Sequence, residues 1–294
     1  MTKISGIFAA TMSVLNSDLS LNVEKTIDHA EKLIDQGCHG TAVFGSTGQA
    51  QLIPISEKIK LLNKLSESKF MDKHLIGTGL NSLGETINLM KIATSLNFKN
   101  FLIMPPAYYK YGDSEVIEFY TRIVEAIPES KIVLYNFEKL CGYKFSIDCV
   151  KELVRRFPNQ IVGVKDSSYN LFEKLKLENF SIFPGSELKL LKGLQLGCSG
   201  IITATCNVTA ELSRKVYDDF FSKKEQTYNK KLCDVRGAFD QYNLISGLHT
   251  FYSKENEIYK NILPPLSVLD NKDEKDLINT LKDLNFTNKS LMAA

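Results

Sequence analysis

Short apolar runs recur through the first two thirds of this chain, each separated from the next by a longer amphipathic stretch. There are eight such runs, at residues 7–10, 41–44, 75–77, 101–104, 132–135, 161–164, 182–183 and 200–202. Each run is continuously apolar instead of alternating with polar residues, which is typical of parallel strands covered on both faces. The chain is therefore expected to build a parallel sheet from repeated strand and helix units.

The stretches between these runs carry helix signals. Residues 23, 27, 30 and 34 mark one apolar face, and Gly37 follows at a C-terminal cap position. Ser82 and Glu85 have the spacing of a capping box, and Ser146 stands where an N-cap belongs. These signals predict helices that connect successive strands.

Eight strand and helix units within about 220 residues favour an α/β fold of the (β/α)8 TIM barrel type. No G-x-G-x-x-G motif follows the first strand, which argues against a doubly wound sheet. Beyond residue 222 the pattern is helical, with Leu232, Val235, Phe239 and Tyr242 on the apolar side of 223–252 and a last helix over 272–284. We expect a catalytic barrel over residues 1–222 and a C-terminal helical extension, residues 223–294, packed on it.

Composition excludes several classes of protein. The net charge of +2, with both signs interspersed, indicates neither a nucleic-acid surface nor a membrane-binding face. The six cysteines include no C-x-x-C pair and the four histidines show no ligand-like spacing, so no metal site is expected. Neither a signal peptide nor an apolar run near the roughly 18 residues of a membrane span is present. A cytoplasmic protein with reduced thiols is expected.

In TIM barrels the chemistry lies at the carboxyl ends of the strands. Here the second predicted strand ends in Gly45-Ser46-Thr47-Gly48, whose glycines let backbone amides approach a small anion closely. The fourth ends in Pro105-Pro106-Ala107-Tyr108-Tyr109, the fifth in Tyr135-Asn136 and the sixth in Lys165. Taken singly, each has a plain alternative: a tight turn, a surface pair of tyrosines, or a lysine that ends a strand in water.

Together these residues would place hydroxyls, phenols and an amine at one barrel mouth. An amine desolvated by an apolar barrel is partly neutral and can attack a ketone, which is Schiff-base chemistry. A tyrosine with a hydroxyl relay partner can serve as the acid and base. The combination favours an enzyme over a non-catalytic metabolite-binding barrel.

Five motifs in order resemble those of the pyruvate-dependent class I aldolases, the dihydrodipicolinate synthase and N-acetylneuraminate lyase family. They are G-S-T-G at 45–48, P-P-x-Y-Y at 105–109, Y-N at 135–136, G-x-K-D-S-S at 163–168 and G-x-x-G-I-I-T at 197–203. The resemblance runs in register from about residue 6 to residue 266. Any one of these motifs is weak evidence, but their common order is specific.

The resemblance implies a role for each matched residue. Lys165 would form the imine with the keto carbon of pyruvate or another 2-keto acid, and Tyr135 would move protons with help from Ser46. A phenol, Tyr109 rather than Tyr108, would come from a neighbouring subunit of a homotetramer arranged as a dimer of dimers. The substrate-binding set would comprise Thr47 and Gly48, which hold the carboxylate, with Ile202, Leu140, Glu138, Gly185 and Glu187. No metal and no separate cofactor would be needed.

Departures from the family pattern bear on the other half of the substrate. Leu140 stands where the synthase branch has a carboxylate-binding arginine, and the adjacent Lys139 is expected to point elsewhere. After the seventh strand only Glu187 supplies an acid, and Ala204 replaces the serine of the sialic-acid branch. Glu138 replaces a proline, and so does Met12 near the first strand; both are expected to affect the shape of the pocket, and a carboxylate at Glu138 can either bind sugar hydroxyls or face solvent. Gln49 replaces a glutamate, which removes a charge.

The sequence therefore predicts a Schiff-base lyase or aldolase that cleaves a 2-keto-3-deoxy sugar acid, or a related hydroxy-keto acid, to pyruvate and an aldehyde. Two alternatives stay open. One is the 4-hydroxy-tetrahydrodipicolinate synthase reaction, which condenses pyruvate with aspartate semialdehyde. The other is a dehydratase of the same family, because loss of water from an imine-activated substrate uses the same lysine and tyrosine.

Overall fold

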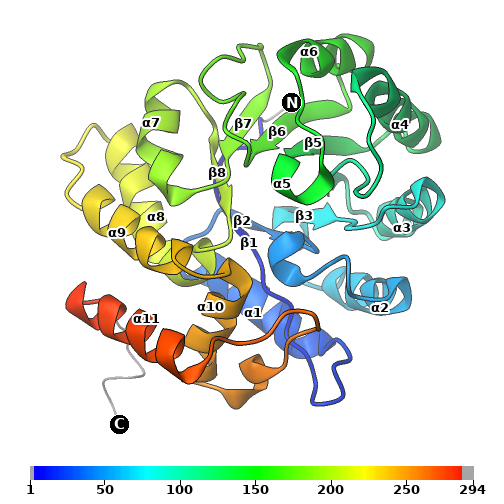
Figure 1. Ribbon diagram of the computed structural model, residues 1–294. Coiled ribbons are helices and arrows are strands. Elements are labelled where there is room, and N and C mark those ends of the chain that lie inside the picture. Colours follow the sequence, from blue (N-terminus) through cyan, green and yellow to red (C-terminus); the bar gives the residue numbers. More distant parts are fainter. Residues whose placement is uncertain (1–2, 287–294) are drawn as a thin grey trace.

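A computed structural model of the chain describes residues 3–286, and within them eight parallel strands close into a barrel (Figure 1). The strands are β1 Gly6–Ala10, β2 Gly40–Val43, β3 His74–Gly77, β4 Asn100–Ile103, β5 Lys131–Asn136, β6 Ile161–Asp166, β7 Ser181–Pro184 and β8 Gly200–Thr203. They are hydrogen-bonded in the order β7-β6-β5-β4-β3-β2-β1-β8. The circle closes where the amide of Ser199 donates to the carbonyl of Ile182 at 2.9 Å. The predicted TIM barrel is confirmed.

Helices follow the strands on the outside of the barrel (Figure 1). They are α1 Val23–Asp35, α2 Ile55–Leu65, α3 Leu83–Ser95, α4 Asp113–Ala126, α5 Glu138–Cys141, α6 Ile147–Arg156, α7 Leu190–Gln195 and α8 Cys206–Phe221, with short 3-10 turns η1 Ser46–Gly48, η2 Met71–Lys73 and η3 Glu187–Lys189. Ser82 and Ser146 cap α3 and α6 as predicted, each hydroxyl accepting from the amide three residues on.

The predicted apolar face of α1 is confirmed but incomplete. Ala30 and Ile34 are buried as predicted and Val23 and Ile27 pack half-buried against the core, but the polar residues Thr26 and His29 are also buried on this side of the helix. Thr26 accepts from the amide of Val14 at 3.0 Å, and His29 bonds to Asn207 at 2.8 Å. Burial lowers the pKa of His29 to about 4, so its ring is neutral at pH 7. Specific hydrogen bonds thus place two polar side chains within the buried face of α1.

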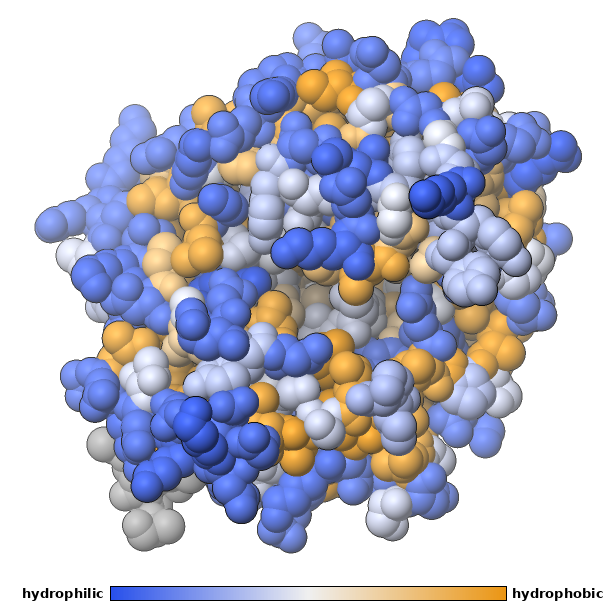
Figure 2. Space-filling view, in the orientation of Figure 1, coloured by the Kyte–Doolittle hydropathy of each residue, from blue (hydrophilic) through white to orange (hydrophobic). Residues whose placement is uncertain are grey.

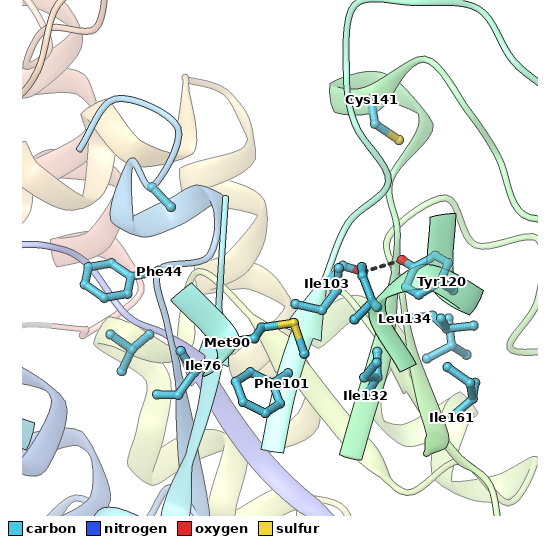
Figure 3. Packing of buried hydrophobic residues seen from close by; sticks show 14 of the residues in the cluster. Phe44, Ile76, Met90, Phe101, Ile103, Tyr120, Ile132, Leu134, Cys141 and Ile161 are labelled. Atoms are coloured by element: carbon cyan, nitrogen blue, oxygen red, sulfur yellow. Dashed lines mark hydrogen bonds between the residues drawn. The ribbon is translucent and has the colours of Figure 1, made fainter. Parts of the chain in front are cut away.

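Side chains fill both sides of the sheet. Inside the barrel lie Phe8, Ala42, Leu75, Leu102, Val133, Tyr135, Phe183 and Ile202. Between the sheet and its helices lies a larger core, of which Figure 3 shows the part around β3, β4 and β5. There the buried hydroxyl of Tyr120 in α4 donates to the carbonyl of Ile103 at 2.7 Å. Because the strands carry apolar side chains on both faces, their sequences are continuously apolar.

The C-terminal segment comprises α9 Asn229–Asp240, α10 Leu244–Ser253, η4 Glu257–Lys260 and α11 Asn271–Asp283. Residues 287–294 of the predicted extension lie outside the described residues. The expectation that Tyr242 continues the helical face of Leu232, Val235 and Phe239 is wrong. Tyr242 lies between α9 and α10, because the side chain of Asn243 accepts from the amides of Ile245 and Ser246 and starts a new helix.

Two departures noted in the sequence belong to this packing. Met12 is fully buried against Phe239, Leu248 and other side chains of the C-terminal helices, so it serves the core between barrel and helices. Gln49 accepts from the amide of Leu263 at 2.8 Å and ties the second strand's loop to the same segment. Within residues 3–286, no helix combines the length and apolarity that crossing a membrane requires.

Candidate active site

A cavity of about 760 Å³ opens at the carboxyl ends of the strands, and Figure 2 shows a hollow near the middle of the face seen in Figure 1. Its volume is within the range of small-molecule sites and far exceeds what pyruvate alone would fill. The predicted residues that line it are Ser46, Thr47, Tyr135, Glu138, Leu140, Lys165 and Gly185. Residues from the ends of β2, β5, β6 and β7 thus meet at one mouth.

Tyr135 and Lys165 lie side by side because β5 and β6 pair in parallel with these two residues in register. The Nζ atom of Lys165 is 4.0 Å from the centroid of the Tyr135 ring. The Tyr135 hydroxyl is 3.0 Å from Oγ of Ser46, which comes from the loop after β2. Lys165 is only 3% exposed although it lines the cavity. An amine, a phenol and a hydroxyl therefore form one contiguous set.

The next residue on each strand holds this pair in place. Nδ2 of Asn136 donates to Oδ1 of the buried Asp166 at 2.8 Å, which locks the ends of the two strands together. Oδ2 of Asp166 accepts from the backbone amides of Leu171 and Phe172, both at 2.9 Å. Three donors satisfy the hydrogen-bonding capacity of this buried carboxylate, and the two backbone amides tie the loop after β6 to it. The orientation of Lys165 therefore depends on the residue that follows it.

The loop after β2 lies between two residues with left-handed backbone, Phe44 at φ 58° and Gln49 at φ 54°. Thr47 is buried and lines the cavity. Gly48 faces away: its carbonyl accepts from the Ser13 hydroxyl at 2.7 Å, and a Cβ added there would lie 2.9 Å from the Thr11 carbonyl oxygen. The glycine is required for close packing against the loop after β1 and does not line the cavity.

Lys58 is a second buried lysine. Burial lowers its pKa to about 8, and its Nζ donates to the carbonyl of Thr78 at 2.6 Å. It does not line this cavity, nor a smaller apolar cavity that adjoins it next to Ser46 and Tyr135. Of these two lysines, only Lys165 can meet a substrate.

Short helix α5, just after β5, forms part of the rim. Leu140 is 42% exposed there, and Glu138 pairs with Lys144 at 3.1 Å while its side chain stays half exposed. Lys139 also lines the cavity, so the expectation that it points elsewhere is wrong. Across the mouth, Gly185 lies where a Cβ would be 2.2 Å from Oγ of Ser167, so a larger residue there would require the Ser167 side chain to move.

Glu187 and Ile202 do not line the cavity. Ile202 is fully buried inside the barrel, in the same cluster as Tyr135. The carboxylate of Glu187 is fully buried, accepts from the hydroxyls of Thr203, Thr205 and Thr209, and pairs with Arg236. Its hydrogen-bonding capacity is used within the protein.

The two tyrosines after β4 lie on the surface. Tyr108 is 90% exposed and Tyr109 75%. Tyr108, not Tyr109, has a left-handed backbone, at φ 88°. An apolar cavity of about 240 Å³ adjoins the main one next to Ser46 and Tyr135, with Phe44, Leu102 and Met104 among its walls.

Several residues of the cavity wall were not predicted from the sequence. They are Phe137, Ser167, Ser168, Tyr169, Ser186, Leu188 and Lys189 from the barrel loops, and Arg236, Asp240, Tyr242, Asn243, Leu244 and Ile245 from α9, α10 and the turn between them. The loop residues follow predicted strands, so their position was a usable signal. The residues of the second group could not be found from the sequence, because a helical pattern does not indicate which end of a helix packs at the mouth of the barrel.

This chain is similar to a known protein family, to a curated relative and to solved structures. The model of the "Dihydrodipicolinate synthetase family" matches residues 3–284. An uncharacterised DapA-like lyase of Chloroflexus aurantiacus is 27% identical over 227 residues, which are 75% of this chain and 76% of that one. Dihydrodipicolinate synthase of Cyanidioschyzon merolae, with lysine bound, superposes at a TM-score of 0.88 with 18% identity over 96% of this chain and 98% of the other.

A sialic acid aldolase of Ruminococcus gnavus, studied as a catalytic lysine mutant, superposes at a TM-score of 0.86 with 17% identity over 96% of this chain and 95% of the other. At these identities the two structures establish a common fold. They leave open whether this chain is closer to a synthase or to an aldolase in its reaction.

Proposed function

The chain belongs to the dihydrodipicolinate synthetase family and is a lyase of the class I aldolase type, and we propose that it cleaves a 2-keto-3-deoxy sugar acid to pyruvate and an aldehyde through an imine on Lys165. The observation that carries this proposal is the buried amine of Lys165, 4.0 Å from the Tyr135 ring, in a cavity that extends well beyond it. The polar wall of the cavity, with Ser167, Ser168 and Ser186, supports a hydroxylated second half of the substrate.

The proposed reaction begins when Nζ of Lys165 attacks the C2 carbonyl carbon, and loss of water leaves a protonated imine. Tyr135 takes the proton of the C4 hydroxyl, the C3–C4 bond breaks, and its electron pair moves into the imine as an enamine. The aldehyde leaves. Protonation of the enamine at C3 and hydrolysis then release pyruvate and restore the amine. This chemistry requires neither a metal nor a separate cofactor.

Residues near the lysine have proposed roles in the same cycle. Ser46, 3.0 Å from the Tyr135 hydroxyl, relays the proton. Thr47, with the backbone of its loop, binds the carboxylate of the keto acid. Leu140 and Glu138 contact the distal half from the rim.

The synthase reaction is the second candidate, because Lys139 lines the cavity next to Leu140 and supplies a cation for the carboxylate of aspartate semialdehyde. A panel of substrates separates the two. We expect 2-keto-3-deoxy sugar acids to be cleaved, with pyruvate measured by a coupled reduction, and expect no condensation of pyruvate with aspartate semialdehyde. Turnover of the latter pair alone would refute the sugar-acid proposal in favour of the synthase, and loss of water without cleavage would identify a dehydratase.

We further propose that a neighbouring subunit of a homotetramer donates a phenol, and that the phenol is Tyr108. Holding a bulky residue in the left-handed region costs on the order of 1–3 kcal/mol, and such strain gathers at functional sites. This favours Tyr108 over Tyr109, although the sequence motif favours Tyr109. The apolar cavity beside Ser46 and Tyr135 has the character required to receive an aromatic ring from a partner.

Tyr108→Phe is expected to lower kcat by about 10²-fold or more, because it removes a proton relay, whereas Tyr109→Phe should retain most activity. Coexpression of Tyr108→Phe with Lys165→Ala should restore activity, since a mixed pair has one site with both the lysine and the phenol. If Tyr109→Phe lost activity and Tyr108→Phe retained it, the donated phenol would be Tyr109. Activity in both variants would exclude a donated phenol.

A further inference from the structure

The distal wall of the cavity contains a charge arrangement that the proposed mechanism does not use. Arg236 and Asp240, one turn apart on α9, both line the cavity, and Glu187 lies fully buried behind them. The guanidinium is thus held between one carboxylate that is buried and one that reaches the substrate space. Its side chain is only 7% exposed, whereas that of Asp240 is 33% exposed.

The hydrogen bonds of Arg236 are almost entirely internal. Its Nη1 donates to Oε2 of Glu187 at 3.0 Å and to the hydroxyls of Thr203 at 3.0 Å and Thr205 at 3.1 Å. Its Nε and Nη2 both lie 2.9 Å from Oδ1 of Asp240. A guanidinium has five N–H donors, and most of them face these protein acceptors. Arg236 therefore has little left with which to bind a substrate carboxylate or phosphate.

Asp240, in contrast, has unused acceptor capacity at the cavity surface. Only Oδ1 takes part in the pair with Arg236, and Oδ2 has no hydrogen-bond partner among residues 3–286. One positive and two negative charges leave the group of Glu187, Arg236 and Asp240 with a net charge of −1. A carboxylate oxygen in this setting accepts hydrogen bonds from hydroxyl groups and repels an anion.

A hydrogen-bond donor lines the same wall of the cavity, three residues further along the chain. Asn243 follows Asp240 in the turn that leads to α10, and its Oδ1 is occupied by the amides of Ile245 and Ser246 at 3.1 and 3.2 Å. Its Nδ2 is left to donate, and the residue lines the same wall. Two cations, Lys139 and Lys189, also line the cavity, but neither belongs to α9 or to the turn that follows it. Nζ of Lys189 lies 5.7 Å from the ring centroid of Tyr169.

We propose that Asp240, fixed in place by Arg236, is the subsite that binds hydroxyl groups of an uncharged substrate tail and selects against substrates that carry a phosphate or carboxylate at that end. The inference rests on the proposed function and makes its substrate class more specific: the sugar acid is not phosphorylated at its distal carbon. Arg236 is a positioning residue, since it acts through Asp240.

The test uses Asp240→Asn, which keeps the size of the side chain and removes its charge, beside Asp234→Asn on the same helix as a matched control. Asp234 forms an exposed pair with Lys230. We expect the wild type to prefer a 2-keto-3-deoxy sugar acid over its 6-phosphate. In Asp240→Asn, kcat/KM for the unphosphorylated acid should fall about 10- to 100-fold, mainly through KM, because a hydrogen bond to a charged group is lost. The ratio of kcat/KM for the unphosphorylated acid to kcat/KM for the 6-phosphate should become smaller. Asp240→Glu should recover part of the lost kcat/KM for the unphosphorylated acid.

Two further readouts separate this inference from the proposed function. Trapping of pyruvate on Lys165 by borohydride should be unchanged in Asp240→Asn, whereas a parallel loss of trapping would mean that Asp240 only supports the fold. Binding of gluconate, which has no keto group and cannot form an imine, should weaken at least about tenfold in Asp240→Asn, whether or not the imine chemistry holds. Unchanged gluconate binding, or a wild-type preference for the 6-phosphate, would overturn the hydroxyl subsite.

Discussion

Lys165→Ala is expected to abolish the pyruvate adduct that borohydride traps on the wild-type protein, and to lower kcat for the true substrate by on the order of 10⁴-fold or more. The physical reason is that the imine is the electron sink of the proposed reaction, and no neighbouring side chain can replace it. Mass spectrometry of the intact protein measures the adduct, and peptide mapping locates it.

Lys189→Met is the matched control for this experiment, because Lys189 lines the same cavity. It should leave trapping intact. The adduct should map to the peptide that contains Lys165 and not to the one that contains Lys58, even though burial lowers the pKa of Lys58 to about 8. Lys58 lines neither cavity and donates to Thr78. An adduct that survives in Lys165→Ala, or none on the wild type, would refute the mechanism.

Glu187→Gln is expected to cause the largest loss of stability among changes near the site, about 3–5 kcal/mol in the free energy of unfolding. Glu187 is fully buried, pairs with Arg236 at 3.0 Å, and accepts from three threonine hydroxyls. The neutral amide leaves the guanidinium with Asp240 as its remaining charged partner and places an N–H₂ group against hydroxyl donors. Denaturant unfolding, followed by circular dichroism, gives the change.

Asp234→Asn is again a suitable control, since its pair with Lys230 is on the surface and should change stability little. If Glu187→Gln unfolded at the same denaturant concentration as the wild type, the buried pair with Arg236 would contribute nothing measurable to stability, and the prediction would be refuted.

The strands were predictable from local pattern because a parallel barrel requires them to be apolar on both faces. All eight apolar runs became strands, with bounds that differ by a few residues at most. The face of α1 was less predictable, since Thr26 and His29 are buried through hydrogen bonds to Val14 and Asn207, which lie outside the helix, 12 and 178 positions away in the chain. The periodicity of apolar residues predicts which face of a helix is hydrophobic, but it does not predict which polar side chains form buried hydrogen bonds.

The lysine-tyrosine pair was predictable for a similar reason. Once β5 and β6 are adjacent parallel strands, register alone brings Tyr135 beside Lys165, and the end of β2 brings Ser46 within 3.0 Å of Tyr135. Strand ends converge at one face of any such barrel. The residues by themselves predicted Schiff-base chemistry, and the resemblance to the pyruvate-dependent aldolases implied that the substrate is a 2-keto acid.

The opposite wall depended on the tertiary structure. Glu187 was predicted to face the substrate, yet it is buried against Arg236, 49 positions further along the chain, and Asp240 reaches the cavity in its place. Whether a carboxylate meets substrate or a buried guanidinium is decided by where α9 packs, and that packing follows from contacts between segments far apart in the sequence. By itself, therefore, the sequence determined the barrel and its amine, because both follow from strand periodicity. Only the fold decided which charged groups surround the rest of the substrate.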